Sequence, residues 1–418
     1  MPNLHLLSPK GFRASGLYAG IKSKPNHDIG FLVADRPASA AAVFTTNRVF
    51  AAPIAIGRKH VAAGKLRGVV LNSGNANACT GPQGLKDAVT MCKLASSLIP
   101  GTDPHEFLPS STGIIGHLLP MEKITAGIRA VVPKLGSSEQ HALDFGASIL
   151  TTDTKRKAAS AQFKIGKETI TLSGICKGAG MIGPRMALPT KAHGQRSVDR
   201  FKGLHATMLA YLTTDAMLPP SLLRELLSTT TDSSFNAVTI DDHMSTNDTA
   251  CLLASGASGA KIDSPKSIKT FTSALDEVCQ SLAYQIAADG EGATKVVRIE
   301  IKNAKDDQSA RAIARSIANS PLVKTAMHGN DPNWGRIISA AGYAGAPFDP
   351  ARATLTLQDT IVFHKGQFAQ FNPAQVSKSL AQPEVHVLLD CKLGKSTFTI
   401  WTCDLSKDYI TINADYHT

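Results

Sequence analysis

A threonine preceded by a small residue stands almost at the middle of this chain, and it limits how the chain can fold. Thr207 follows Ala206 in a sequence of 418 residues. The hydroxyl of such a threonine can attack the preceding carbonyl, the peptide then becomes an ester, and water splits the ester. Thr207 would then carry a free α-amine, whose pKa of ~8 suits a general base near neutral pH. The two products, residues 1–206 and 207–418, are expected to remain associated.

The Ala206–Thr207 pair by itself leaves a second interpretation open. Alanine–threonine pairs are common, and a threonine is also typical of the start of an amphipathic helix. Only the motifs around Thr207 decide between the two.

Composition predicts a globular protein of the cytoplasm. Hydrophobic residues make up 43% of the chain, and no apolar run approaches the ~20 residues of a membrane span. The first residues lack the apolar core and the cleavage site of a secretory signal. The seven cysteines are odd in number, and no two have C-x-x-C spacing. This argues against a disulfide framework and a structural zinc site, and for a reducing compartment.

Charge adds one clue about ligands. The 44 Lys and Arg residues exceed the 33 Asp and Glu residues, which gives a net charge of +11. The basic residues are scattered, and aromatic residues, at 6%, offer few platforms on which bases could stack. The sequence therefore predicts no nucleic-acid partner. A basic surface does attract carboxylate substrates.

Strand-like and helix-like segments alternate along the chain. Apolar residues at helical spacing predict helices over 275–286 and 310–317, and Ser273 with Asp276 forms a candidate capping box for the first of them. Runs typical of strands are 67–71, 167–175, 296–302, 385–389 and 397–401. The mixture predicts an α+β protein whose helices cover antiparallel or mixed sheets. The pattern alone does not separate this from a doubly wound sheet.

Two short motifs suggest ligands that the chain is not expected to bind. The segment 178–183 fits G-x-G-x-x-G after a strand, but Pro184 and Pro189 oppose the long helix that a dinucleotide site requires. The run 241–243 is Asp-Asp-His. Neighbouring residues of a strand point to opposite faces, so these three would not converge on one metal ion.

Motifs spread over the chain identify a family. In order along the sequence they are Val43–Asn47, Asn72–Ala78, Ser111–Gly116, Thr151–Thr154, Lys177–Ile182, Ala206–Leu209, Leu212–Ala216, Ser245–Thr249, Asp289–Lys295, Asp331–Arg336 and Ile412–Thr418. Together they resemble the ornithine acetyltransferases, the glutamate N-acetyltransferases of cyclic arginine biosynthesis. Their number and order are far more specific than any single motif.

The resemblance implies a fold, a reaction and an assembly. The fold is a sandwich of helices around two stacked mixed or antiparallel sheets. The reaction moves an acetyl group from N-acetylornithine to glutamate through an acetyl ester on Thr207. No cofactor is implied, although some members also accept acetyl-CoA as a donor. The N-terminal (α) chain and the C-terminal (β) chain of the precursor are expected to assemble as a heterotetramer, two of each.

The resemblance also assigns roles to residues. Thr207 corresponds to the nucleophile, and Thr112 with Gly113 to the oxyanion hole. Lys177 is expected to face the α-carboxylate that both substrates share, and Glu291 the side-chain amine of ornithine. The substrate-binding positions as a whole correspond to Thr151 or Thr152, Lys177, Thr207, Glu291, Asn413 and Thr418.

The chain departs from the family pattern just before Thr207. Residues 188–206 form a polar, basic insertion that is expected to be a surface loop, and Arg185 replaces the usual asparagine. Two alternative functions stay open. One is an N-terminal-nucleophile amidase or aminopeptidase in which water replaces glutamate. The other is an uncleaved, non-catalytic protein whose insertion binds a partner.

Overall fold

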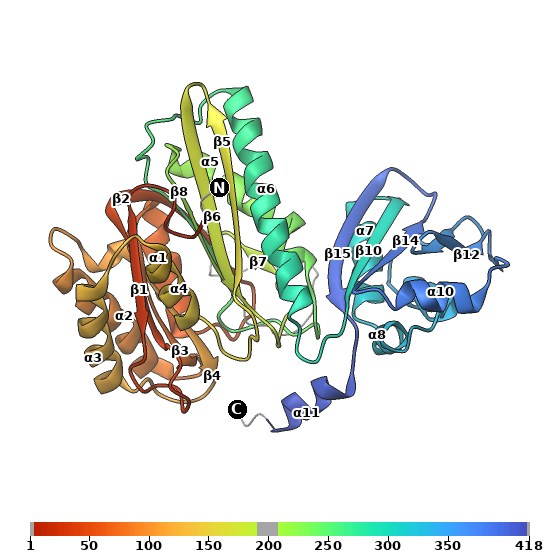
Figure 1. The fold of residues 1–418 in the computed structure, drawn as a ribbon, viewed down its shortest axis with the longest axis horizontal. Helices are drawn as coiled ribbons and strands as arrows, with labels where there is room; N and C mark the ends of the chain where they lie inside the picture. The colour runs from red at the N-terminus through yellow and green to blue at the C-terminus, as the bar shows by residue number, and fades with distance from the viewer. Residues whose placement is uncertain (1–3, 190–207, 416–418) are drawn as a thin grey trace. The chain divides into compact units, whose positions relative to one another are not determined.

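The computed structural model of the chain describes residues 4–189 and 208–415, and it divides into two compact units (Figure 1). The first unit contains the chain up to Asn236 together with His243–Leu282, and the second contains Ala237–Asp242 and Ala283–His417. This division does not follow the predicted cleavage, because residues from both sides of Thr207 build the first unit.

A nine-stranded mixed sheet forms the first unit. Its strands run in the order β4-β3-β2-β9-β8-β6-β5, and both β1 and β7 pair with β2. The pairs β3–β4 and β8–β9 are parallel, and the other pairs are antiparallel. The strands are β1 (Phe12–Leu17), β2 (Ile29–Thr45), β3 (Lys65–Asn75), β4 (Phe107–Ile114), β5 (Lys157–Ile165), β6 (Glu168–Lys177), β7 (Met186–Ala187), β8 (Leu209–Thr214) and β9 (Thr249–Ala254).

Helices cover both faces of this sheet. Met91 of α2 and Ile124 of α3 lie in one core cluster with Phe31, and Phe145 of α4 lies in the other with Leu32. Alternate residues of β2 thus face opposite cores, as the pleat requires. The helices are α1 (Ala52–His60), α2 (Gly81–Leu98), α3 (Met121–Val131), α4 (Glu139–Ser148), α5 (Pro220–Ser233) and α6 (Pro265–Ala288), with single 3₁₀ turns at Val61–Ala63, Pro104–Glu106, Val132–Lys134 and Phe235–Ala237.

Strands from both sides of Thr207 interleave in the sheet. β8 and β9 follow Thr207 in sequence, yet they lie between β6 and β2, which precede it. Every residue of β8 and β9 is buried, which is typical of interior strands with both faces covered. The alternative of an amphipathic helix after Thr207 is therefore wrong, since residues 209–214 form a central strand.

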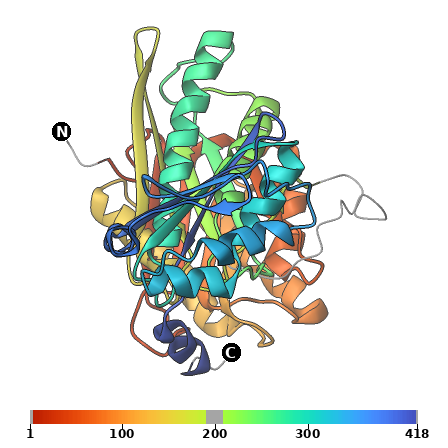
Figure 2. The same ribbon diagram turned by 90° about the vertical axis from the view of Figure 1, so that its right-hand side faces the viewer.

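A six-stranded mixed sheet forms the second unit, in the order β13-β12-β11-β14-β10-β15. Only β10 and β14 pair in parallel. The elements are β10 (Val296–Ala304), α7 (Asp307–Ala318), α8 (Pro321–His328), α9 (Trp334–Gly342), β11 (Thr354–Leu357), β12 (Thr360–His364), β13 (Gln367–Phe368), α10 (Pro373–Leu380), β14 (Glu384–Asp390), β15 (Ser396–Cys403) and α11 (Lys407–Asp415) (Figure 2).

Helix α7 shows why this sequence folds as it does. The side chain of Asp306 accepts a hydrogen bond from the amide of Ser309 and begins the helix. Apolar residues then recur at helical spacing from Ala310 to Ile317 and are buried against β10 and β15. The predicted helix over 310–317 and the predicted strands 296–302, 385–389 and 397–401 are confirmed.

The predicted capping box is wrong. Helix α6 begins at Pro265, so Ser273 and Asp276 lie inside it. Asp276 instead accepts a hydrogen bond from the hydroxyl of Thr230, at 2.7 Å. The apolar pattern extends further towards the N-terminus than expected, because Phe271 packs edge-on against Phe163 of the β5–β6 hairpin, with 6.1 Å between ring centroids.

The α+β class with two mixed sheets and covering helices is confirmed.

A matched pair of serine variants tests the revised helix start. Ser273→Ala is expected to leave the free energy of unfolding within about 0.5 kcal/mol of the parent, because alanine is the better residue inside a helix. Ser320→Ala is expected to cost ~1 kcal/mol, because Ser320 caps α8 and its hydroxyl accepts from the amide of Val323 at 3.4 Å. Urea unfolding followed by circular dichroism measures both, and a larger loss in Ser273→Ala would restore the capping box.

Candidate active site

Several of the predicted site residues lie outside the described residues. These are Ala206, Thr207 and Thr418, and of the insertion at 188–206 only Leu188 and Pro189 are described. Met208, the next described residue, leads directly into β8. The site is therefore built from the residues that surround this strand and from those of the second unit.

The amide of Met208 is held by a buried carboxyl group. Its N–H donates to Oδ1 of Asp248 at 2.5 Å, and its carbonyl accepts from the amide of Thr249 at 3.0 Å. Oδ2 of Asp248 is buried and has no hydrogen-bond partner among the described residues. Burial raises the pKa of Asp248 well above its ordinary value, against the smaller lowering effects of the Met208 amide and the Lys177 ammonium. The neutral, protonated form is therefore favoured.

Lys177 ends β6 in a buried ion cluster. Its Nζ donates to Oγ1 of Thr151 at 2.8 Å and lies 3.8 Å from Oδ2 of Asp153. Oδ1 of Asp153 also accepts from Nζ of Lys157 at 2.7 Å and from the amide of Gly178 at 2.6 Å. Of the two candidate threonines, Thr151 is thus the one whose hydroxyl contacts Lys177.

The ionisation of Asp153 is opposite to that of Asp248. Burial alone would raise its pKa, but the ammonium groups of Lys177 and Lys157 outweigh burial and lower the pKa to about 2. Asp153 is therefore a carboxylate at neutral pH. It holds Lys177 charged and in place while the side chains of both residues are almost entirely buried.

Thr112 and Gly113, the predicted oxyanion hole, lie near the end of β4. Oγ1 of Thr112 is buried and has no hydrogen-bond partner in the described part of the chain. Gly113 has a φ of +128°, and a Cβ there would come within 2.4 Å of the backbone of Gly74. Only glycine fits this position without strain. A buried hydroxyl without a partner costs ~1–3 kcal/mol, so it calls for a functional explanation.

Asn247 connects this turn to the strand that holds Met208. Its side-chain amide donates to the carbonyl of Ser111 and to that of Ala76, each at 2.8 Å. Ser111 precedes Thr112 and Asn247 precedes Asp248. The side chain of Asn247 therefore brings the predicted oxyanion hole next to the segment where β8 and β9 begin.

A second lysine approaches the same cluster. The side chain of Lys22 lies against Gly74, and its Nζ donates to the carbonyl of His27 at 2.5 Å. Burial lowers the pKa of Lys22 to about 8. Asp28 opposes this shift and the positive charge of Lys177 adds to it. Sequence analysis assigned no role to Lys22, Asp153, Asn247 or Asp248. Three of these four lie inside matched motifs, which is the only signal that could have found them.

Glu291 and Asn413 form a separate group in the second unit. Nδ2 of Asn413 donates to Oε2 of Glu291 at 2.9 Å, and it also donates to the carbonyl of Tyr409. The predicted site residues that are described thus form two separate groups, one within each unit. In the described part of the chain, no cluster of three His, Cys, Asp or Glu residues could hold a metal ion.

Comparison with known proteins identifies relatives over nearly the whole chain. The sequence profile of the ArgJ family matches residues 13–418. The arginine biosynthesis bifunctional protein ArgJ of Geobacter sulfurreducens is 43% identical over 415 residues, which cover 99% of this chain and 100% of that protein. The protein of the same name from Symbiobacterium thermophilum is 41% identical over 415 residues, 98% of each chain. A crystal structure of argJ from Bacillus halodurans is 43% identical, with a TM-score of 0.43, and the match covers 44% of this chain and 95% of that one. Among the described residues, no helix has both the length and the apolar character needed to cross a membrane.

The two buried aspartates, Asp153 and Asp248, are expected to change the stability of the fold with pH in opposite directions. The folded pKa of Asp153 lies below the ~3.9 of an unfolded aspartate, so its stabilising contribution of roughly 2–3 kcal/mol is present above pH ~4 and is lost as pH falls towards 2. The folded pKa of Asp248 is raised, so its contribution is complete below pH ~4 and is lost as pH rises.

The corresponding asparagine variants make this measurable. Asp153→Asn should be less stable than the parent at pH 7, and the gap should narrow below pH 4. Asp248→Asn keeps an acceptor for the Met208 amide. Its free energy of unfolding should rise relative to that of the parent as pH rises from 4 to 8. Urea unfolding at a series of pH values gives both trends. Parallel trends in the two variants would contradict the assigned ionisation states.

Proposed function

The chain belongs to the ArgJ family, and we propose that it transfers the acetyl group of N-acetyl-L-ornithine to L-glutamate through an acetyl ester on Thr207. A role in arginine biosynthesis follows from the names of its full-length relatives. The proposed acetyl transfer is supported by the chemistry of the described site residues.

The observation that carries the proposal is the buried ammonium group of Lys177. A buried charge is stable only when it is paired and hydrogen-bonded, and Thr151 with Asp153 supply both. The nearby Lys22 adds a second positive charge, whose pKa is lowered to about 8 mainly by burial. The cluster brings the three lysines Lys22, Lys157 and Lys177 near the two aspartates Asp28 and Asp153. This formal excess of positive charge favours an anionic ligand, and the α-carboxylate common to acetylornithine and glutamate is such a ligand.

Self-cleavage comes first in the proposed sequence. The Thr207 hydroxyl oxygen attacks the carbonyl carbon of Ala206, and the peptide nitrogen leaves as the α-amine of Thr207. Water then hydrolyses the Ala206 ester and frees the hydroxyl. The products are an N-terminal chain, 1–206, and a C-terminal chain, 207–418. The interleaving of β8 and β9 between β6 and β2 supports their continued association.

Acetyl transfer then proceeds in two balanced steps. The Thr207 hydroxyl attacks the acetyl carbonyl of acetylornithine while the α-amine takes its proton. The C–N bond breaks, and the same proton passes to the departing amine of ornithine. The amine of glutamate next attacks the acetyl ester and gives up a proton to the α-amine. The ester C–O bond breaks, and the same proton passes to the departing Thr207 oxygen, which restores the hydroxyl.

Each tetrahedral intermediate carries a negatively charged oxygen. The proposed donors to this oxygen are the Thr112 hydroxyl and the Gly113 amide. Oγ1 of Thr112 is buried without a partner among the described residues, which leaves its proton available for a developing oxyanion. Loss of one such donor typically lowers the rate ~10²–10³-fold.

Recognition of ornithine is assigned to the second unit. The Glu291 carboxylate would pair with the side-chain amine, with Asn413 and the terminal Thr418 completing the contacts. The acetyl group is carried on the threonine, so no bound cofactor is needed. Because the relatives are named bifunctional, we also propose acetyl-CoA as a second donor, used as a substrate. The processed enzyme is proposed to contain two chains of each kind.

The rival functions are separated by product analysis and by mass. An amidase or aminopeptidase would release acetate whether or not glutamate is present, whereas the transferase forms N-acetylglutamate only with it. An uncleaved binding protein would give a single chain of 44.1 kDa. In that case the insertion at residues 188–206 would be the segment that binds the partner.

The cleavage prediction is tested on the purified protein. Mass spectrometry should find fragments that begin at Met1 and Thr207, which separate only after denaturation. Thr207→Ala should abolish both cleavage and turnover, and Thr207→Ser should keep part of each because a hydroxyl remains. Thr229→Ala, an exposed threonine of α5, is the matched control and should behave as the parent. A single uncleaved chain in the active parent protein would contradict the scheme.

The two-step transfer predicts ping-pong kinetics. Ornithine must leave before glutamate reacts, so double-reciprocal plots at several glutamate concentrations should be parallel. With acetylornithine alone, the fragment 207–418 should gain the mass of one acetyl group. Rates should fall as pH drops through the α-amine pKa of ~8, because a protonated amine cannot accept a proton. Intersecting lines without an acetylated fragment would indicate direct transfer, and Thr207 would lose its assigned role.

A further inference from the structure

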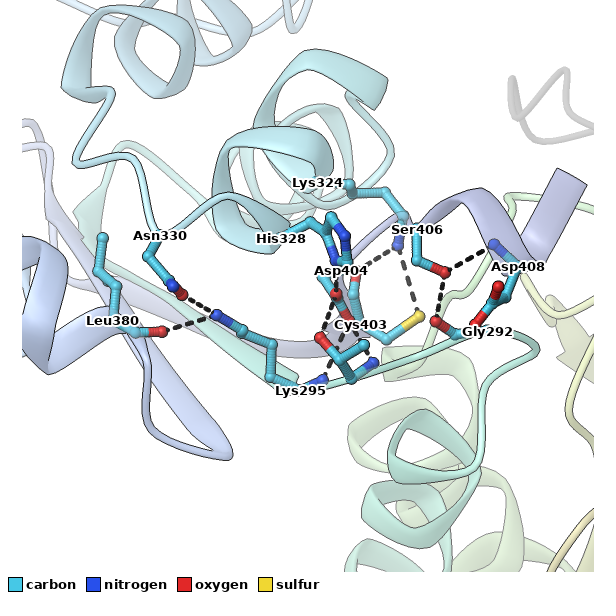
Figure 3. A network of polar contacts seen from close by, with 11 residues as sticks. Gly292, Lys295, Lys324, His328, Asn330, Leu380, Cys403, Asp404, Ser406 and Asp408 are labelled. Atoms are coloured by element: carbon cyan, nitrogen blue, oxygen red, sulfur yellow. Dashed lines mark hydrogen bonds and ion pairs between the residues drawn. The ribbon is translucent and has the colours of Figure 1, made fainter.

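The segment 404–406, which joins β15 to α11, is hydrogen-bonded to the loop that carries Glu291. This loop runs from Gly290 to Lys295, immediately before β10. Asp404 and Ser406 belong to the gripping segment, and Figure 3 shows both directed towards the loop. All these residues lie in the second unit.

Asp404 is the centre of the grip. Oδ1 accepts from the amides of Thr294 and Lys295, at 2.8 and 3.0 Å. Oδ2 accepts from the Thr294 hydroxyl at 2.6 Å and lies 2.7 Å from Nδ1 of His328. The side chain is fully buried. Burial would raise its pKa, but the hydrogen bonds from Thr294 and His328 keep the pKa of Asp404 below the ordinary value. The carboxylate thus satisfies four donors at once.

Ser406 grips the middle of the same loop. Its hydroxyl donates to the carbonyl of Gly292 at 2.6 Å and accepts from the amide of Asp408 in the first turn of α11. Gly292 has a φ of +70°, and a Cβ there would lie 2.4 Å from the amide nitrogen of Tyr409. The loop backbone therefore approaches the start of α11 as closely as glycine alone allows.

Glu291 is held between these contacts. On its other side, a Cβ at Gly290 would lie 2.9 Å from Sγ of Cys403. The loop and α11 are thus fixed to one another on both sides of Glu291. The same α11 carries Asn413, which donates to the Glu291 carboxylate at 2.9 Å.

Two lysines anchor the grip to the rest of the unit. Nζ of Lys324, on α8, donates to the carbonyl of Cys403 at 2.5 Å and to the hydroxyl of Thr402 at 2.9 Å. Nζ of Lys295 donates to Oδ1 of Asn330 and to the carbonyl of Leu380, the latter at 2.9 Å (Figure 3). The position of Asp404 is thereby fixed, because the end of β15 and the loop 290–295 are both hydrogen-bonded to neighbouring parts of the unit.

We propose that Asp404 is a positioning residue for substrate selection: it fixes the loop 290–295 so that Glu291 and Asn413 stay aligned to receive the side-chain amine of the ornithine substrate. This rests on the function proposed above for Glu291. Asp404 does not touch the substrate and acts only through the loop. Its loss therefore affects acetylornithine, which carries the amine, and leaves glutamate, which lacks it, almost unaffected.

The test compares Michaelis constants for the two substrates in the processed, full-length enzyme. Asp404→Asn keeps the shape of the side chain but cannot accept hydrogen bonds at both of its end atoms. It should raise the KM for acetylornithine ~10-fold, which is well within the loss that a 1 Å misplacement can cause. The KM for glutamate should change by less than ~2-fold. Glu291→Gln should show the same pattern, and the double variant should be no worse than the more severe single variant.

Two further variants separate positioning from loss of stability. Asp390→Asn removes a carboxylate from the same sheet, where it accepts from Asn303 and from the amide of Lys392, and it should shift neither KM. Thr294→Val removes one donor to Asp404 at an exposed position and should shift the KM for acetylornithine in the same direction by a smaller factor. It replaces Asp404→Asn if that variant does not fold.

The outcomes distinguish the inference from the proposed function. If Glu291→Gln is selective but Asp404→Asn and Thr294→Val shift both constants equally or neither, the inference is overturned and the role of Glu291 stands. If Glu291→Gln is itself unselective, the role of Glu291 and the inference both fall. Absence of any acetyl transfer by the parent enzyme would overturn the proposed function and the inference with it.

Discussion

Strand β8 is hydrogen-bonded along both of its edges, to β6 on one side and to β9 on the other, and all six of its residues are buried. A strand in this position cannot be removed without breaking two ladders. The proposed cleavage just before β8 would therefore not release this strand, because β8 and β9 lie between strands that precede Thr207 in the sequence. The rest of the candidate site depends on this arrangement, since the start of β8 places Met208 beside Asp248 and the end of β6 places Lys177 in the same sheet.

Two aspartates near this strand show how environment decides chemistry. Asp153 and Asp248 are both deeply buried, yet Asp153 is surrounded by two ammonium groups and two backbone amides, whereas Asp248 receives one amide and leaves an oxygen without a partner among the described residues. The first is a carboxylate that keeps Lys177 charged. The second is favoured as a neutral acid. A site that handles anionic substrates needs both properties, because a second carboxylate would cancel the positive charge that Lys177 offers.

Prediction from sequence succeeded where the signal was local. Apolar spacing located the buried face of α7 and the strands β10, β14 and β15, because these elements repeat one pattern over most of their length. It failed at the start of α6, where contact between Phe271 and Phe163, more than a hundred residues apart, extends the helix beyond Ser273. It also could not show that Thr151, and not Thr152, accepts a hydrogen bond from Nζ of Lys177, since that contact exists only in the folded chain.

The sequence by itself determined the family to which the motifs of this chain point and the residues that are proposed to carry its chemistry. Three features can be read directly from the sequence without knowledge of the fold. They are the small residue before Thr207, the glycine at 113 and the acidic residue between two glycines at 291. Tertiary structure alone decided which charges are paired and which polar atoms are left without partners. Asp153 meets Lys177, Asn247 meets Ser111, and Asp404 meets Thr294 only after strands distant in sequence have paired. The burial and the ionisation state of a side chain depend on the residues around it, and these contacts form only when the chain folds.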